Sequence, residues 1–237
     1  MKNLIFSDAH GRSIEQLLAD AKKEGVERII GLGDYDTPEV LRELLESDLK
    51  KIVVVGNHDY HYLKGLFVHS ELMNGSARSY TKKWNRASYT HEREFLWAAI
   101  DKPNQTRAIV ISRKMGERRV AFSHSSITKA KDWETDIPLC FWERIIGTES
   151  AKNEFRLLVN RNINILFRGH DHYSGVYTYQ NDKIPRIRGR FFREEVVLEP
   201  SDRHIVCVGA YHRGEYCLFD DKTGIVNFIG GLHLKID

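Results

Sequence analysis

Short apolar runs alternate with amphipathic stretches through the first sixty residues of the chain. Apolar residues at 3–7, 28–32 and 51–55 predict three strands. Residues at helical spacing predict two intervening helices, with apolar faces formed by Ile14, Leu17, Leu18, Ala21 and by Val40, Leu41, Leu44, Leu45. Thr37 and Pro38 suit the N-cap and first residue of the second helix. This order predicts a β-α-β-α-β unit with a parallel sheet, and hence an α/β fold.

The pattern weakens over residues 60–106, where aromatic and basic residues mix, and we interpret this stretch as an insertion or cap. Further strands are predicted at 107–111 and 119–122, around a turn near Gly116. A helix is expected at 141–146 and again at 151–159, followed by strands at 164–167, 205–208, 215–219 and 225–229, the last three antiparallel. No repeat or linker divides the chain, so residues 1–237 are expected to form a single domain.

The composition is that of a globular protein, because 41% hydrophobic residues are too many for a disordered chain. The apolar opening is cut off at Asp8, too soon for a signal peptide or a membrane span. Cys140, Cys207 and Cys217 show no CxxC spacing, so we expect buried thiols rather than disulfides. These features predict a cytoplasmic protein with no membrane partner, and they leave the oligomeric state undefined.

The net charge of +3 is unevenly distributed along the chain. Residues 61–120 contain 12 Lys and Arg against 5 Asp and Glu, so this segment carries +7 and the remainder −4. Such a segment can attract phosphate-rich ligands, but its charges follow no register that would define a groove, and we favour a solvated surface. A second basic group either contacts a phosphate or nucleotide or forms a polar hairpin rim; it consists of Arg186, Arg188, Arg190 and Arg193.

Polar clusters follow the predicted strands directly. Asp8-Ala9-His10 comes after the first strand, Gly33-Asp34 after the second and Gly56-Asn57-His58-Asp59 after the third. Because ligands bind outside the carboxyl ends of parallel strands, these clusters should meet at one edge of the sheet. Two later clusters, at His124 and at Gly169-His170-Asp171-His172, also follow predicted strands.

The residue types in these clusters match a pair of adjacent metal ions. Two ions about 3.5–4 Å apart can activate water and bind phosphoryl oxygens. Holding them takes a bridging carboxylate and several neutral donors, and the candidates are Asp8, His10, Asp34, Asn57, His124, His170 and His172. Imidazole with carboxylate suits manganese, our expected metal, and also iron, zinc, nickel and cobalt.

Together, the five clusters resemble, in order, the motifs of the calcineurin-like metallophosphoesterase superfamily. The resemblance implies a four-layer α/β/β/α sandwich with two mixed β-sheets flanked by helices. It implies a first metal held by Asp8, His10, Asp34 and His172. It implies a second metal held by Asp34 as the bridge together with Asn57, His124 and His170, and a bridging hydroxide as nucleophile. His58 would be the catalytic residue beside the leaving group, either as a general acid or as an electrostatic stabiliser.

The second motif departs from that of the protein serine/threonine phosphatase branch, which typically reads Gly-Asp-x-x-Asp-Arg-Gly. Here Asp36 comes one place early and Thr37-Pro38 follows it, which argues against an Asp-oriented His58 and against a protein phosphatase. Asp59 in place of the Glu of that branch points the same way. The chain looks more like the compact prokaryotic phosphodiesterase branch, whose closing segment resembles residues 209–211 and 216–220 here.

We therefore expect hydrolysis of a small phosphodiester, with nucleotides among the candidates. The alternatives are a phosphomonoesterase or protein phosphatase, a nuclease, which needs a nucleic-acid groove, and a non-catalytic binding scaffold. Asp59 and Asp171 are expected either to orient ligand imidazoles or to shape turns. A surface or packing role is expected for the remaining histidines, which are His61, His69, His91, His204, His212 and His233.

Overall fold

The structure is a computed structural model of the chain, and it describes residues 1–64, 82–128, 141, 143–145, 148–180, 186–188 and 195–230. The amino-terminal part alternates strands and helices as predicted: β1 (Lys2–Phe6), α1 (Glu15–Lys23), β2 (Arg28–Gly31), α2 (Pro38–Glu46) and β3 (Lys50–Val54). Thr37 is the extended N-cap residue of α2 and Pro38 its first residue, although the Thr37 hydroxyl makes no capping hydrogen bond. No helix within the described ranges is long and apolar enough to span a membrane.

The first sheet has seven strands in the order β10-β13-β12-β1-β2-β3-β4. Its remaining members are β4 (Arg107–Ala108), β10 (Glu195–Val197), β12 (Tyr216–Asp220) and β13 (Ile225–Ile229). β1 to β4 run parallel, whereas β12, β13 and β10 add antiparallel pairs. Phe6 pairs with Gly31 and Gly31 with Val53, so β1, β2 and β3 end level with one another.

The second sheet has six strands in the order β5-β6-β7-β11-β8-β9. They are β5 (Val110–Met115), β6 (Arg118–Ser123), β7 (Ile165–Arg168), β8 (Ser174–Tyr179), β9 (Arg186–Arg188) and β11 (Arg203–Val208). β6, β7 and β11 run parallel, and the other pairs are antiparallel. Ser123 pairs with Arg168, so β6 and β7 also end level.

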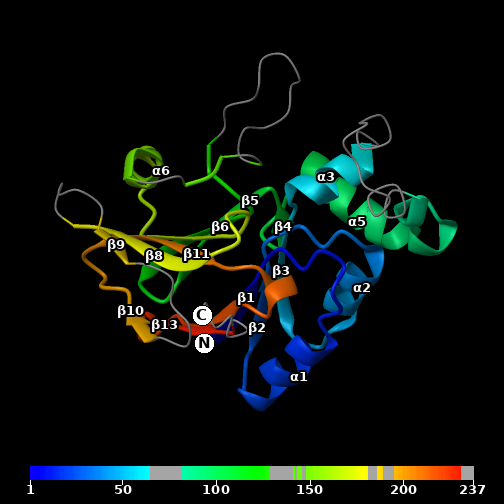
Figure 1. Cartoon of the computed structure of the whole chain (residues 1–237), viewed down its shortest axis with the longest axis horizontal. Coiled ribbons are helices and arrows are strands. Elements are labelled where there is room, and N and C mark those ends of the chain that lie inside the picture. Colours follow the sequence, from blue (N-terminus) through cyan, green and yellow to red (C-terminus); the bar gives the residue numbers. More distant parts are fainter. Residues whose placement is uncertain are drawn as a thin grey trace, which may run out of the picture.

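Three apolar clusters hold four layers together. One cluster lies between the two sheets and includes Ile5 of β1 and Phe167 of β7. Leu4 and Phe6 point to the opposite face, where they meet α1 and α2, because successive side chains of a strand face opposite sides. The third cluster joins α6 (Thr148–Asn160) to the second sheet. Helices thus lie on both outer faces (Figure 1), and the predicted sandwich of two mixed sheets flanked by helices is confirmed.

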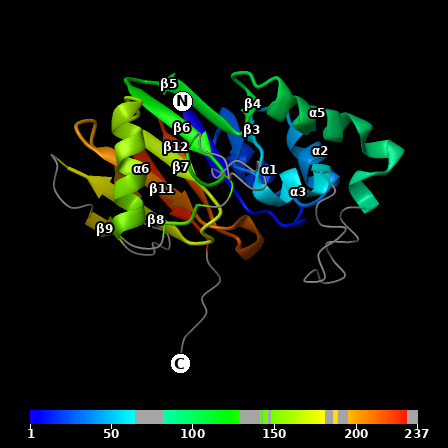
Figure 2. The ribbon, with the colours of Figure 1, turned by 90° about the horizontal axis from the view of Figure 1, so that it is seen from above.

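The described part of the stretch interpreted as a cap includes the helical elements η2 (Ala87–Tyr89) and α5 (Thr90–Asp101), and α3 (Asn57–Lys64) leads into it from β3. α5 lies beside α2 and α3 at the end of the molecule away from α6 (Figure 2). Trp84 is buried in the same core as α2, and its indole nitrogen donates to the backbone carbonyl of Asp36 over 2.9 Å. A capping function for this stretch stays a prediction.

Two predicted elements differ in the structure. The strand expected at 107–111 is two strands in different sheets, since Ala108 of β4 pairs with Val54 and Val110 of β5 with Ser123. The helix expected at 141–146 is wrong for residues 143–145, whose backbone groups bond elsewhere. The Glu143 carbonyl accepts from Arg168, and the Ile145 amide donates to Asp171. Trp142 and Ile146 lie outside the described residues.

Other predictions are confirmed where the structure describes them. The turn near Gly116 joins β5 to β6, and β12 and β13 form an antiparallel pair. The expected antiparallel grouping of the last three strands is wrong for β11, which lies in the other sheet, antiparallel to β8 but parallel to β7. Cys207 and Cys217 are buried free thiols, whereas Cys140 lies outside the described residues. Arg186 and Arg188 belong to β9, and Arg190 and Arg193 lie outside the described ranges.

Candidate metal centre

All seven predicted metal ligands lie in segments that follow five parallel strands. Asp8 and His10 follow β1, Asp34 follows β2, Asn57 follows β3, His124 follows β6, and His170 and His172 follow β7. Because these strands end level within each sheet, the segments meet at one edge of the sandwich. A cavity of about 460 Å³ opens there, lined by His10, Asp34, Asn57, His58, Arg144, His170, His172 and His212.

The first group of candidate ligands surrounds the Asp8 carboxylate. His172 Nε2 lies 3.0 Å from Asp8 Oδ1, and His10 Nε2 lies 3.8 Å from the same oxygen. The two Nε2 atoms are 3.2 Å apart. Two nitrogens that each lie about 2.1 Å from one ion are roughly 3.0–3.4 Å apart. This spacing therefore fits a shared metal ion without a large rearrangement.

The second group surrounds the Asp34 carboxylate. His124 Nε2 lies 3.3 Å from Asp34 Oδ2 and 2.8 Å from Asn57 Oδ1. The ring of His170 packs against that of His124 at a centroid distance of 5.1 Å. Ligand atoms of Asp8, Asp34 and His124 all lie within 4.8 Å of one another, so the two groups adjoin. The Asp34 carboxylate thus lies close both to Asp8 of the first group and to His124 of the second.

The backbone at the site is held in an unfavourable conformation. Seven described residues other than glycine have a positive φ angle, and all but Asn162 belong to the site. The six site residues are Asp8, His10, Asp34, Asp36, His170 and His172. Such left-handed conformations are costly for residues with a side chain and cluster at functional sites. The fold therefore imposes these angles, which direct the side chains towards the centre.

Two glycines permit the close approach of these loops. A Cβ added at Gly56 would collide with the Asp34 carboxylate, and one added at Gly169 would collide with the Ser7 hydroxyl. Only glycine, which has no Cβ, leaves room for such a close approach. The glycines therefore allow loops of different strands to pack around the carboxylates.

The site has the electrostatics of a cation site. Asp8 and Asp34 are almost completely buried, and His172 Nε2 lies 3.0 Å from Asp8 Oδ1. Burial opposes ionisation of Asp8, but hydrogen bonding to His172 and the charge of His124 outweigh it and lower the pKa of Asp8 to about 2. Buried charge needs compensation, and divalent cations fit this arrangement of carboxylates and imidazoles.

The histidines respond to these charges in opposite ways. Burial lowers the pKa of His124, but the negative charge of Asp34 outweighs burial and raises the pKa to about 9. Burial, together with the charge of His124, lowers the pKa of His170 to about 3. In the metal-free protein, His124 thus carries a proton at neutral pH while His170 is neutral.

Metal binding should therefore release protons and weaken as the pH falls. An ion must displace the proton of His124, so below about pH 9 the affinity should fall by about tenfold per pH unit for each displaced proton. Calorimetric titration at pH 7.5, in buffers of differing ionisation enthalpy, measures this release. A binding enthalpy independent of the buffer would contradict the expected protonation.

His58 faces the same cavity from the first turn of α3. Its Nδ1 lies 2.9 Å from Asp36 Oδ1, while the other oxygen of Asp36 lies 3.1 Å from His10 Nδ1. The early position of Asp36 in the motif argued against an Asp-oriented His58, and this expectation is wrong. The left-handed conformation of Asp36 brings its carboxylate between the two imidazoles. Burial alone would lower the pKa of His58, but the charges of Asp34 and Asp36 outweigh it and raise the pKa to about 10.

Replacing Asp36 by asparagine should lower turnover by about 10- to 100-fold, the usual effect of losing a group that orients a functional imidazole. Asparagine tolerates the left-handed backbone, but it offers one acceptor oxygen to two imidazole Nδ1 atoms. Turnover and metal content measured on the same preparation test this expectation. Unchanged values for both would show that Asp36 does not position these rings.

Asp59 and Asp171 shape loops in the contacts that the structure describes. The Asp59 carboxylate accepts hydrogen bonds from the backbone amides of Asp34, Tyr35 and Gly56. Asp171 pairs with the buried Arg168 at 2.9 Å and also accepts from the Ile145 amide. The turn-shaping alternative therefore agrees with these contacts.

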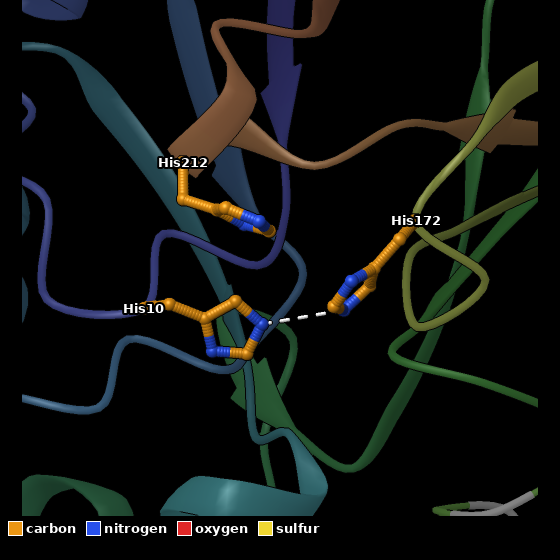
Figure 3. A group of neighbouring side chains, drawn as sticks. All are labelled: His10, His172 and His212. Carbon is orange, nitrogen blue, oxygen red and sulfur yellow. Dashed lines mark hydrogen bonds between the residues drawn. The ribbon is translucent and has the colours of Figure 1, made fainter. Parts of the chain in front are cut away.

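Three residues at the site were not among the predicted site residues: Asp36, Arg144 and His212. His212 was expected to have a surface or packing role, but its ring lies 4.9 Å from that of His10 and 5.3 Å from that of His172 (Figure 3). Arg144 is exposed at the rim of the cavity. No sequence motif marks Arg144 or His212 as a site residue. For Asp36 the only sequence signal was its proximity to Asp34.

Among the other histidines for which a surface or packing role was expected, His91 is exposed and His204 is buried by packing. His69 and His233 lie outside the described residues.

Comparison with known proteins identifies the class. The family model described as "Calcineurin-like phosphoesterase superfamily domain" matches residues 1–184. The chain therefore belongs to the calcineurin-like phosphoesterase superfamily. It is accordingly a hydrolase of phosphoesters from a metal-dependent family. A comparison with curated proteins gives no match.

Solved structures share the fold at low sequence identity. A metallophosphoesterase from Sphaerobacter thermophilus is 20% identical with a TM-score of 0.61, over 98% of this chain and 88% of that one. Hypothetical protein PH1004 from Pyrococcus horikoshii OT3 is 14% identical with a TM-score of 0.60, over 99% and 89%. A structure described as a novel archaeal phosphodiesterase is 14% identical with a TM-score of 0.51, over 97% and 99%.

Proposed function

We propose that the chain is a dinuclear metal-dependent phosphodiesterase acting on a small substrate, with nucleotides among the candidates. The observation that carries this proposal is the pair of buried carboxylates, Asp8 and Asp34, each surrounded by imidazole or amide groups and adjoining the other. Two adjacent buried carboxylates are costly to keep ionised in a protein core, and divalent cations would compensate their charge.

The residues that would hold the first ion are Asp8, His10, Asp34 and His172, and those for the second are Asp34, Asn57, His124 and His170. Two divalent cations at such a site activate a water molecule for attack on phosphorus and neutralise charge on the phosphoryl oxygens. Manganese is the expected metal, and iron, zinc, nickel and cobalt also suit this donor set.

Two side chains at the cavity act on the substrate in this proposal. His58 is partly exposed to the cavity, so its imidazole can donate a proton to the leaving-group oxygen or stabilise its charge. The guanidinium of Arg144 at the rim binds a non-bridging oxygen or a second phosphate of the substrate. Asp36 positions His58 for this role.

The size of the cavity supports a small substrate, because about 460 Å³ suits a nucleotide-sized ligand better than a protein surface. The departure of the second motif from the protein phosphatase pattern supports a diester. The near-neutral chain gives little support for a nucleic-acid groove. We also propose a cytoplasmic location, which the free thiols of Cys207 and Cys217 support.

Hydrolysis of bis(para-nitrophenyl) phosphate beside para-nitrophenyl phosphate tests the substrate class. The protein is stripped with a chelator and reloaded separately with manganese, cobalt, nickel, zinc or magnesium. Metal-dependent cleavage that favours the diester would support the proposal and justify a screen of nucleotide diesters. A preference for the monoester would replace it with a phosphomonoesterase, and metal binding without turnover would favour a binding scaffold.

A further inference from the structure

His212 lies in a segment outside the five motifs, yet this segment is bound to the loops of the first metal site. It belongs to η4 (Tyr211–Arg213), which follows β11 and precedes β12. The backbone amide of Tyr211 donates to the Ser7 carbonyl over 2.8 Å, and that of His212 to the Asp8 carbonyl over 3.1 Å. Arg213 donates to the His172 carbonyl over 3.0 Å. The fold therefore fixes η4 against both the β1 loop and the β7 loop.

The imidazole of His212 completes a triangle with two candidate ligands. Its ring centroid lies 4.9 Å from that of His10 and 5.3 Å from that of His172, while the latter two are 5.1 Å apart. One ring nitrogen of each lies within 4.8 Å of the others. The three rings, which come from three separate segments, are turned towards a common point (Figure 3).

Hydrogen bonding defines which nitrogen of His212 can coordinate. Nδ1 lies 3.0 Å from the Asp8 carbonyl oxygen, and since a carbonyl can only accept, Nδ1 carries the hydrogen. Nε2 then holds the lone pair of the neutral ring. His124 has the same arrangement, with Nδ1 donating to the Leu32 carbonyl and Nε2 directed at Asp34 and Asn57. A backbone acceptor on the second ring nitrogen is typical of metal-binding histidines.

We propose that His212 is a further ligand of the first metal, which it binds through Nε2 together with His10, His172 and the carboxylates of Asp8 and Asp34. The proposal rests on the dinuclear centre proposed above. With this ligand the two metal sites differ in composition, because the first has three imidazole ligands and the second has two. The first site should consequently favour ions that prefer imidazole, such as zinc and cobalt, over manganese.

The variant His212→Asn tests the ligand directly. The asparagine amide retains a donor near the Nδ1 position for the Asp8 carbonyl, while the coordinating Nε2 is removed. Loss of a group that merely orients a ligand weakens metal binding by about 10- to 100-fold, so loss of a ligand should weaken the first site at least about tenfold. The exposed His91 provides the matched control, His91→Ala.

Stepwise affinities for cobalt(II), from competition with a chromogenic chelator, and the visible spectrum of the cobalt(II) protein are the two readouts. We expect one of two sites to weaken in His212→Asn and its visible bands to change, with the second site and the control unaltered. The loss should be greater for cobalt than for manganese. His212→Ala, with thermal unfolding of the metal-free protein as a folding check, repeats the test.

Unchanged affinities and spectrum in a folded His212→Asn protein would overturn the proposal, and a raised KM alone would assign His212 to the substrate instead. The experiment also distinguishes failure of this ligand assignment from failure of the proposed phosphodiesterase function. If the wild-type protein binds two ions and His212→Asn weakens one of them, the ligand assignment stands even where no phosphoester is hydrolysed. A wild-type protein that binds no second ion would overturn both.

Discussion

Replacing Asp34 by asparagine should empty both metal sites and lower phosphoester hydrolysis by about ten-thousandfold. Asp34 is buried, its carboxylate adjoins Asp8, and its Oδ2 lies 3.3 Å from His124 Nε2. A shared carboxylate both neutralises and positions two cations. These cations contribute several kcal/mol to transition-state stabilisation. Because each factor of ten in rate corresponds to about 1.4 kcal/mol, their loss should lower the rate by about four powers of ten. Metal content by mass spectrometry and turnover on one preparation check both expectations.

Asparagine is a suitable replacement because the fold can retain it. It tolerates the left-handed backbone that Asp34 adopts, and its side-chain oxygen can still accept the hydrogen bond that the His58 amide donates over 2.9 Å. The metal-free variant should therefore still fold, although losing the charge of Asp34 beside His124 should lower its unfolding temperature relative to the metal-free wild type. A variant that keeps two ions and most of its turnover would remove Asp34 from its bridging role.

Replacing His58 by alanine should lower turnover by about 100- to 10,000-fold while both metals stay bound. This range is typical of a lost proton donor or acceptor at a reacting group. The His58 ring faces the cavity and contacts Asp36 through Nδ1, whereas its backbone amide holds Asp34. Alanine removes the ring and keeps the amide, so the ligand geometry should survive.

His91→Ala, a change at an exposed histidine of α5, is the control for effects of removing an imidazole. The division of roles predicts two bound ions in both variants and a loss of turnover in His58→Ala alone. If His58→Ala loses as much metal as Asp34→Asn, His58 would be a ligand or a structural support rather than the residue beside the leaving group.

The sequence predicts the seven candidate ligands because each directly follows an apolar strand. Parallel strands that end level place such residues at one edge, whatever the details of packing, as Asp8, Asp34 and Asn57 illustrate. His124 and His170 join them because β6 and β7 also end level in the second sheet. The local pattern therefore contains the information that determines this part of the site.

The remaining site residues depend on tertiary contacts that no local pattern encodes. His212 reaches the site because β12 pairs with β1 and brings η4 beside the β1 loop, a contact across about two hundred residues. Arg144 lies in a segment whose backbone bonds to Ser125, Arg168 and Asp171 instead of forming the helix that its apolar neighbours favour. The position of Asp36 in its motif argued against a contact with His58, and the contact follows from the left-handed backbone of Asp36.

A titration of the stripped protein with manganese, with bound metal and diester turnover measured at each addition, tests the dinuclear centre most directly. The proposed dinuclear centre predicts that binding ends at two ions per chain and that turnover follows occupancy of the pair, staying low while one ion is bound. Full turnover with one ion per chain, or two bound ions without turnover on any phosphoester, would contradict a two-metal hydrolase.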